Sequence, residues 1–403
     1  MRIALTCCLL VAGLAVGCGK DEEKHEVRAL TAQEQALVQS SNAFGFSFFN
    51  EVLAQSDGGN AFVSPLSVSM ALGMTYNGAR NGTEVGMRHA LAYGEMSTDE
   101  INQSYASLID LLTTMDPKVT MEIANSIWYR QGLNVLAEFV ATVQTYFDAV
   151  VTALDFGDAG AAGTINAWVS DKTHDKIPSI VDGPIDPDTV MFLINAIYFK
   201  GSWTQRFEAD ATVDATFHAP AGDKSVKMMH LDKEVPYLST EDFQAVDLTY
   251  GDGLFGMTVI LPEDGRDIDA VAAELTEASW STWMAGLNKR EIMVGLPRFE
   301  LEYDSLLNDV LVALGMQDAF SGAADFSGID GLTDLFISKV KHKTFVKVDE
   351  EGTEAAAATS VEVNLAAAPL DTMIIDRPFL FVIHDWHSQA LLFMGKIVDP
   401  PSN

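Results

Sequence analysis

The pattern of apolar and polar positions predicts a protein that mixes buried helices with strands. Residues 60 to 79 contain no charged residue, and Ser64 and Pro65 form an N-cap and first-turn pair inside this stretch. Apolar residues from Leu66 to Met74 follow, so the helix has no charged face. A helix of this kind belongs in the middle of a large protein. We therefore expect a buried helix that begins near Pro65.

Three further segments carry strand patterns. Residues 121 to 129 alternate between apolar and polar, and residues 191 to 199 form an apolar run of strand length. The alternation is strict from residue 340 to residue 348, where His342 shares a face with valines and should point inward. The opposite face carries Lys339, Lys341, Lys343 and Lys347.

The segment between Val348 and Phe379 lacks a comparable pattern. It is about thirty residues long, and compact domains rarely keep such a segment without a functional reason. By propensity alone, Ala355 to Ala358 favour a capped helix. A strict strand ends at Val348, however, and strand-like alternation resumes at Val361, which argues against a helix. Residues 350 to 376 are therefore where we look for function.

The rest of the chain indicates one α+β domain. It has no internal repeat, no linker rich in Pro, Gly and Ser, and no regular alternation of strands and helices. We assign residues 31 to 403 to this domain.

The first residues predict export. Arg2 precedes a mostly apolar stretch that is too short to span a bilayer, so residues 1 to 17 are interpreted as a signal peptide. Cys18 follows Ala-Val-Gly, which resembles the lipidation site of bacterial lipoproteins. Residues 18 to 30 would then be a charged tether between lipid and domain. The alternative is an ordinary signal peptide with an incidental cysteine.

We accordingly expect an exported lipoprotein anchored to a membrane at Cys18. It would be periplasmic or on the cell surface, and Gly19 is compatible with the outer membrane. The other two cysteines are Cys7 and Cys8, so the domain must be held together by core packing without disulfides. The formal net charge of −32 repels phosphate backbones, which excludes nucleic acid as a partner.

Enzyme and metal signatures are absent. There is no Gly-x-Ser-x-Gly elbow, phosphate-binding loop or His-Glu-x-x-His motif. The glycines of Gly251-x-Gly253-x-x-Gly256 match a dinucleotide motif by letters, but a strand pattern follows them, so we interpret them as a turn. His384 and His387 flank a predicted hairpin turn, where a surface loop is favoured over metal binding. We expect no enzyme activity, no metal and no cofactor.

Residues 350 to 359 closely resemble the hinge of inhibitory serpins, the serine protease inhibitor family. The positions that carry this resemblance are Glu350, Gly352, Thr353, Glu354, Ala355, Ala356, Ala357, Ala358 and Thr359. Other segments resemble the family in the same order along the chain, from about residue 35 to residue 400. They are residues 60 to 67, 77 to 79, 195 to 203, 296 to 299, 325 to 328, 377 to 379 and 393 to 396.

The resemblance implies a metastable α+β fold with three sheets, about nine helices and an exposed reactive-centre loop. A protease would attack the loop and form an acyl-enzyme, and the N-terminal part of the cut loop would insert into the central sheet as a new strand. Inhibition is then a race between insertion and hydrolysis. Large or charged side chains that enter the core would stall insertion. The inward set here is small: Thr353, Ala355, Ala357 and Thr359.

The remaining matched positions control the sheet in this family. Gly352 would supply the pivot, and Glu354 would face outward. Trp203 matches the breach, where insertion begins. The polar cluster beneath the sheet, called the shutter, is matched by Ser64, Ser67, Asn195 and His342. By chemistry alone, each of these four could also be a satisfied core polar group.

The scissile bond stays open among three positions. Counting from the hinge places the cut after Ala366, counting back from Arg377 places it after Ala367, and Leu365 is the third option. Alanine suits an elastase-like protease and leucine a chymotrypsin-like one. No Lys or Arg lies between Asp349 and Asp376, which excludes trypsin-like targets.

We therefore expect a monomeric suicide inhibitor of serine proteases. The alternative within the family is a non-inhibitory serpin that acts as a binding or chaperone-like protein. Such members usually carry bulky, charged or proline-bearing hinges, which this chain lacks. A lipoprotein hydrolase would need a nucleophile–base pair that the sequence does not display.

Overall fold

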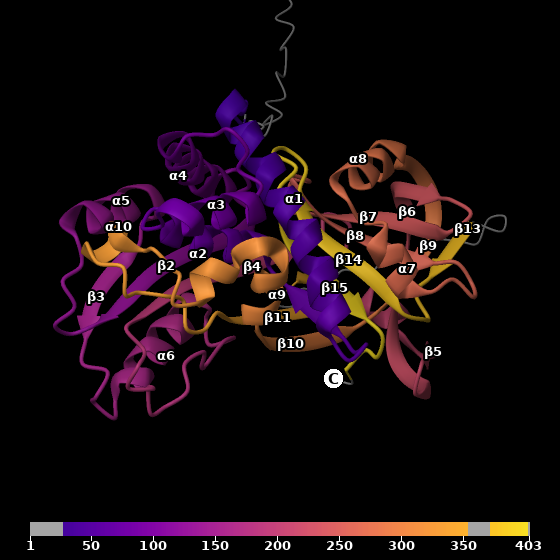
Figure 1. Ribbon diagram of the computed structural model, residues 1–403. Coiled ribbons are helices and arrows are strands. Elements are labelled where there is room, and N and C mark those ends of the chain that lie inside the picture. Colours follow the sequence, from indigo (N-terminus) through magenta and orange to yellow (C-terminus); the bar gives the residue numbers. More distant parts are fainter. Residues whose placement is uncertain (1–26, 354–370, 402–403) are drawn as a thin grey trace, which may run out of the picture.

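The computed structural model describes residues 27 to 353 and 371 to 401 (Figure 1). Helix α1 (Ala32–Gln55) begins with a capping box between Thr31 and Glu34. The predicted buried helix is α2 (Pro65–Tyr76), which Ser64 caps by accepting a hydrogen bond from the Ser67 amide. Every residue of α2 except Ala71 is buried, as its uncharged sequence predicts.

The central sheet has six strands and contains all three strand patterns found in the sequence. Their order is β10-β11-β12-β4-β2-β3. The bounds are β10 (Phe299–Leu306), β11 (Lys341–Asp349), β12 (Gly352–Thr353), β4 (Met191–Ser202), β2 (Val119–Arg130) and β3 (Val150–Leu154). In β11, His342, Thr344, Val346 and Val348 are buried while the lysines between them are not, so the predicted inward face is confirmed.

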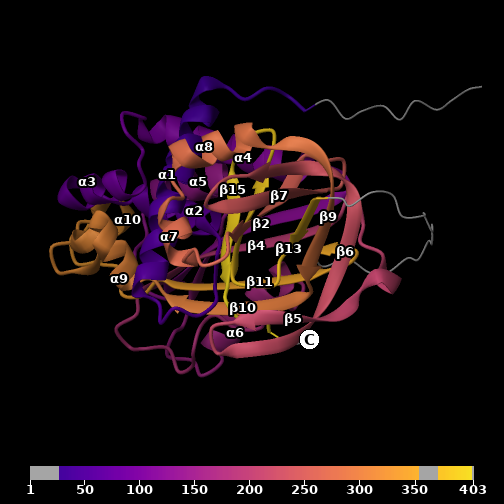
Figure 2. The same ribbon diagram turned by 90° about the vertical axis from the view of Figure 1, so that its right-hand side faces the viewer.

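Two further sheets meet at one long strand. The first contains β1 (Ala61–Val63), β15 (Leu391–Ile397), β14 (Phe379–Asp385), β8 (Phe255–Pro262) and β7 (Phe243–Tyr250). The second contains β5 (Val213–Ala219), β6 (Gly222–Ser239), β9 (Asn288–Pro297) and β13 (Asp371–Ile374), with β13 beside β9 (Figure 2). Residues 237 to 239 of β6 also pair with β7 and join the two sheets.

Ten α-helices are present within the described ranges, and together with the three sheets they form the expected α+β fold. Helix α2 covers one face of β4, and α6 (Ala161–Lys172) covers the opposite face of β4 and β2 (Figure 1). The remaining helices are α3 (Asn81–Ala90), α4 (Thr98–Thr114), α5 (Ala137–Phe147), α7 (Ile268–Ala273), α8 (Glu277–Gly286), α9 (Asn308–Leu311) and α10 (Ser327–Asp330). None of the described helices is long and apolar enough to cross a membrane.

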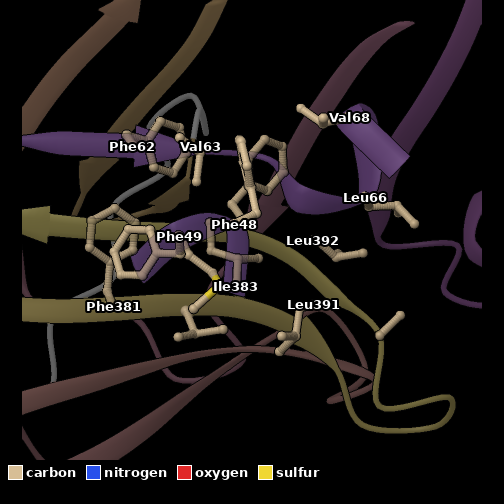
Figure 3. Packing of buried hydrophobic residues seen from close by; sticks show 14 of the residues in the cluster. Phe48, Phe49, Phe62, Val63, Leu66, Val68, Phe381, Ile383, Leu391 and Leu392 are labelled. Atoms are coloured by element: carbon tan, nitrogen blue, oxygen red, sulfur yellow. The ribbon is translucent and has the colours of Figure 1, made fainter. Parts of the chain in front are cut away.

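The main core lies where α1, α2 and the β14–β15 hairpin meet (Figure 3). Phe62 of β1 stacks on Phe381 and Phe393, with ring centroids 5.5 and 5.3 Å apart. Phe48 and Phe49 of α1 and Leu66 of α2 are also fully buried in this core. Aromatic pairs of this kind are stabilising beyond the area they bury. This packing holds α2 firmly beneath the central sheet.

Two expectations about loops are wrong. Residues 350 to 376 are not free of packed structure, because Gly352–Thr353 forms β12 in the central sheet and Asp371–Ile374 forms β13. His384 is not on a surface loop. It is the sixth residue of β14, 1% exposed, and its Nε2 lies 3.0 Å from the Asp247 carboxylate. Both errors come from partners that lie far away in the sequence.

The predicted turns are otherwise confirmed. Gly251 and Gly253 lie in the tight connection between β7 and β8, and both have positive φ angles. The β14–β15 hairpin turn contains His387. No cluster of three or more potential metal ligands occurs in the described part of the chain.

Candidate functional site

Strands β4 and β11 are joined at only one end of the central sheet. Thr353 of β12 lies opposite Gly201 of β4 and Val348 of β11, and Gly352 forms the next pair on each side. Across the described residues, no hydrogen-bonded register joins the rest of β4 to the rest of β11. Residues 191 to 200 and 341 to 347 therefore form no ladder with each other, and we call the space between them the groove; residues 191 to 194 and 337 to 341 line a cavity at its far end. An unpaired strand edge is a template for another strand.

The chain enters the groove through Gly352 and Thr353. Gly352 has a φ of 149°, and a Cβ at this position would collide with the carbonyl oxygen of Gly201, so only glycine fits. Thr353 is buried, and its hydroxyl lies 2.8 Å from the hydroxyl of Tyr250. The start of the predicted hinge is thus already a strand of the sheet, with its inward threonine satisfied.

Trp203 organises the turn that precedes β12. Its Nε1 donates to the carbonyl oxygen of Asp349 at 2.9 Å, and its backbone amide donates to the carbonyl oxygen of Glu351 at 2.9 Å. The indole stacks on Tyr250, with ring centroids 4.3 Å apart. Burial raises the pKa of the Asp349 carboxyl above its usual value. The residue predicted to mark the breach therefore lies at the closed end of the groove.

Glu350 is anchored beside this turn. Its carboxylate accepts a hydrogen bond of 2.7 Å from Arg298 Nε, a further bond from Arg298 Nη2, and one from the Thr212 hydroxyl. Glu350 is buried, while the Arg298 side chain is one-third exposed. Sequence reasoning included Arg298 in a matched motif but assigned it no role, because its partner is 52 residues away. No pattern in the sequence pointed to Thr212 as a partner of Glu350.

The four predicted shutter residues lie together beneath the middle of the groove. The Ser64 amide donates to His342 Nε2 at 3.0 Å, and the Ser64 hydroxyl donates to the carbonyl oxygen of Leu392 at 2.7 Å. The Ser67 hydroxyl donates to the carbonyl oxygen of Asn195 at 3.4 Å. The cluster therefore connects α2 with strands on both sides of the groove.

Burial sets the protonation state of this cluster. It lowers the pKa of His342 to about 4, against a small opposing effect of Asp304. A neutral ring agrees with the geometry, because Nε2 must carry a lone pair to accept from the Ser64 amide. His342 is consequently a neutral acceptor at physiological pH.

Asn195 extends the cluster to the neighbouring strand. Its Nδ2 donates to the side-chain oxygen of Asn125 at 2.7 Å, and Asn125 Nδ2 donates to the carbonyl oxygen of Phe147. Asn195 Oδ1 is buried and has no hydrogen-bond partner in the part of the chain that the structure describes. Buried polar atoms are rarely left unsatisfied, so this acceptor requires an explanation. Sequence reasoning missed Asn125.

The segment that follows α6 crosses the opposite face of the groove. His174 packs on Tyr198 of β4 with ring centroids 4.3 Å apart, and its Nε2 lies 3.0 Å from Glu122 of β2. Lys176 lies over the ring of Phe345 of β11, 4.9 Å from its centroid. These contacts link the two walls of the groove, and no local pattern in the sequence predicted them.

Several predicted residues lie outside the described ranges. These are the lipidation candidate Cys18, the reactive-bond candidates Leu365, Ala366 and Ala367, and the hinge positions Glu354, Ala355, Ala356, Ala357, Ala358 and Thr359.

A three-sheet α+β fold whose central sheet has a groove beside its hinge is typical of one class of protein, and similarity to known proteins identifies the family. The chain belongs to the serpin family, described as serpin (serine protease inhibitor), whose match covers residues 39 to 400. Leukocyte elastase inhibitor of Bos taurus is 36% identical over 379 residues, which covers 91% of this chain and all of that protein.

Solved structures agree in fold. The thermophilic serpin tengpin in its native state superposes with a TM-score of 0.84 at 30% identity, covering 93% of this chain and 96% of that chain. Human thyroxine-binding globulin in complex with thyroxine gives a TM-score of 0.85 at 27% identity, covering 92% of this chain and 100% of that chain.

Proposed function

We propose that this protein is an irreversible suicide-substrate inhibitor of serine proteases, and not an enzyme. The observation that carries the proposal is the groove between β4 and β11, which the hinge has already entered as the two-residue strand β12. After a protease cuts the loop and forms the acyl-enzyme, the cut loop would continue from Thr353 as a full strand. The attached protease would be carried along and deformed before it hydrolyses the acyl bond.

The register of β12 predicts which residues of β4 and β11 each inserted loop residue would pair with. Thr353 lies opposite Gly201 and Val348, and an antiparallel strand advances one residue on itself for each residue back on its neighbours. Ala355 would then lie opposite Val346, Ala357 opposite Thr344, and Thr359 opposite His342. The small residues of the loop would face the buried side of β11.

This register also offers a partner for the orphaned acceptor of the shutter. Thr359 would lie between Asn195 and His342, and its hydroxyl could donate to Asn195 Oδ1, which is buried without a partner in the described chain. A new hydrogen bond to a buried, unsatisfied acceptor stabilises the inserted state. Insertion would therefore add side-chain bonds as well as a backbone ladder.

We propose an elastase-like target, with a chymotrypsin-like protease as the second choice. The candidates Ala366 and Ala367 present a small side chain before the cut, and Leu365 presents a larger apolar one. The identity to leukocyte elastase inhibitor supports the first choice.

Denaturing gel electrophoresis tests the proposal. The purified protein is mixed separately with pancreatic elastase, chymotrypsin and trypsin, and boiled in SDS. We expect elastase to give a band at the summed mass of both proteins. The mass of the released C-terminal peptide then shows which of the three candidate bonds is cut. Trypsin, whose pocket requires Lys or Arg, is the matched control. If elastase and chymotrypsin only cut the loop and stay active, the inhibitory proposal fails for those targets.

A non-inhibitory serpin that binds a ligand or acts as a chaperone is the second candidate. The likeness to thyroxine-binding globulin favours it. A protein of this kind would be cut within residues 354 to 370 without trapping the protease, and its heat stability would not increase. The small residues of the hinge favour the inhibitory function.

We also propose that the protein is an exported monomer held at a membrane by a lipid on Cys18, periplasmic or at the cell surface. The apolar leader and Cys18 support this location. Mass spectrometry of the protein isolated from its membrane fraction would show a diacylglyceryl cysteine as the first residue. A soluble product cleaved elsewhere would contradict it.

A further inference from the structure

A second feature of the groove is a cavity at the end farthest from β12. Its volume is about 530 Å³, within the range that holds small-molecule ligands. The walls come from the start of β4, from residues 335 to 341, from α2 and from the loop between α6 and β4. They are mainly apolar, and the residues that matter here are Ala71, Leu72, Ile185, Met191, Leu193 and Ile337.

The rim of the cavity is apolar as well. Leu306 and Phe336 line it and are nevertheless 53% and 48% exposed. Large apolar side chains that remain exposed around a hollow indicate a binding surface. An apolar chain that enters the cavity would cover both.

Four charged side chains line the cavity, namely Asp182, Asp186, Lys339 and Lys341. Lys341 Nζ pairs with Asp182 at 2.8 Å, and Asp186 accepts the backbone amide of Asp188 at 2.9 Å. Lys339 lines the cavity too and is exposed; among the described residues it forms no ion pair within 4 Å, although its charge helps to lower the pKa of Asp182. The cavity therefore combines an apolar interior with a positive group at its edge.

We propose that this cavity binds a long-chain carboxylate, with the alkyl chain against Met191, Leu193 and Ile337 and the carboxylate at Lys339. Burial of the alkyl chain would supply most of the affinity, because each methylene removed from water is stabilising. Lys339 would favour the acid over neutral analogues. The long-chain carboxylate is in this way distinguished from an uncharged lipid.

Occupancy of the cavity would also regulate insertion, and this step rests on the proposed function. The register of β12 would bring loop residues 360 to 363 opposite residues 194 to 191 of β4, into the space of the ligand. The ligand and the distal half of the inserting loop would compete. A bound carboxylate would slow insertion. More of the inhibitor would then be cleaved and released as an ordinary substrate, and less would trap the protease.

Isothermal titration calorimetry with laurate, below its micelle concentration, tests the site on the full protein. We expect one laurate per chain, affinity lowered roughly fivefold in Lys339→Ala, as for an exposed ion pair, and binding abolished in Ala71→Phe, which fills the cavity. Lys347→Ala, which lies in β11 and outside the cavity, is the matched control and should bind like the unmodified protein. Dodecanol should bind Lys339→Ala and the unmodified protein equally.

The absence of laurate binding, or equal laurate affinity in Lys339→Ala and Lys347→Ala, would overturn the proposed site. A second measurement tests the competition: laurate should lower the fraction of elastase held in the boiling-resistant complex and raise the fraction of cut inhibitor. Unchanged trapping at saturating laurate would overturn the competition. If no elastase is trapped even without laurate, the proposed function fails, while the calorimetric result still decides the site.

Discussion

At the scale of single residues, the groove is bordered by polar groups whose partners come from distant segments. His342 bonds to a residue 278 positions earlier, and Glu350 to Arg298 across 52 positions. Alternation along one strand predicts that His342 points inward, because successive side chains of a strand point to opposite faces of the sheet. It does not predict the partner. The same limit explains why the burial of His384 against Asp247 was missed, since that pair is separated by 137 positions.

Protonation of His342 should weaken the folded state. Its pKa is about 4 in the fold and 6.5 when exposed, so the unfolded chain binds the proton more readily. The stabilising contribution is complete above pH 6.5 and is lost as the pH falls toward 4, by roughly 3 kcal/mol in total. Urea unfolding followed between pH 7 and pH 4 measures this loss.

His342→Gln supplies the control for that titration. Glutamine keeps a neutral acceptor for the Ser64 amide but has no proton to gain. The difference in stability between the two proteins should therefore change across this pH window. A constant difference would show that His342 does not titrate as its burial requires.

The Glu350–Arg298 pair should contribute more than the surface pairs of the same sheet. Glu350→Gln removes a buried carboxylate that accepts two hydrogen bonds from Arg298, and we expect a loss of about 2 kcal/mol, reduced by the partial exposure of Arg298. Glu300→Gln breaks the exposed pair with Lys347 and should cost less than about 0.5 kcal/mol. The free energy of unfolding of both variants, measured by chemical denaturation, tests this difference. Equal losses would contradict a special role for Glu350.

At the scale of elements, local patterns were sufficient where an element is defined by its own burial. Helix α2 and strands β2, β4 and β11 were predicted because each carries either an alternating or a continuous apolar pattern that burial enforces. Strands β12 and β13 were not predicted. Each has no more than four residues and exists only through pairing with β4, β11 or β9. The segment that follows α6 was also missed, because its role depends on contacts to two separate strands.

Strand β12 is the element whose alteration should separate cleavage from trapping. Thr353→Arg would place a charge in the buried position that faces Tyr250, and burial of an unpaired charge is costly. We expect the loop still to be cut but the yield of the boiling-resistant elastase complex to fall about tenfold or more. Glu354→Arg, expected to face outward, is the matched control and should trap nearly as well. Equal yields from both variants would rule out insertion through this register.

At the scale of the whole molecule, the groove between β4 and β11 supports the proposal that the sheet accepts the cut loop as a further strand. The order of motifs along the sequence indicated the family, but it could not show that the hinge already occupies one end of the groove, or that a cavity lies at the other end. Both depend on how separate sheets and helices pack. Insertion of the loop would add backbone hydrogen bonds along both β4 and β11 and so complete the ladder. The free energy gained from these bonds would drive the proposed mechanism.

Amide hydrogen exchange of β4 and β11, before and after the loop is cut, tests this account most directly. Residues 191 to 200 and 341 to 347 border the groove, whereas β14, paired on both sides, serves as the internal reference. We predict that protection of β4 and β11 rises strongly after cleavage while that of β14 stays the same, together with a higher unfolding temperature. Unchanged exchange along both edges of the groove would mean that the loop does not insert, and the account would be wrong.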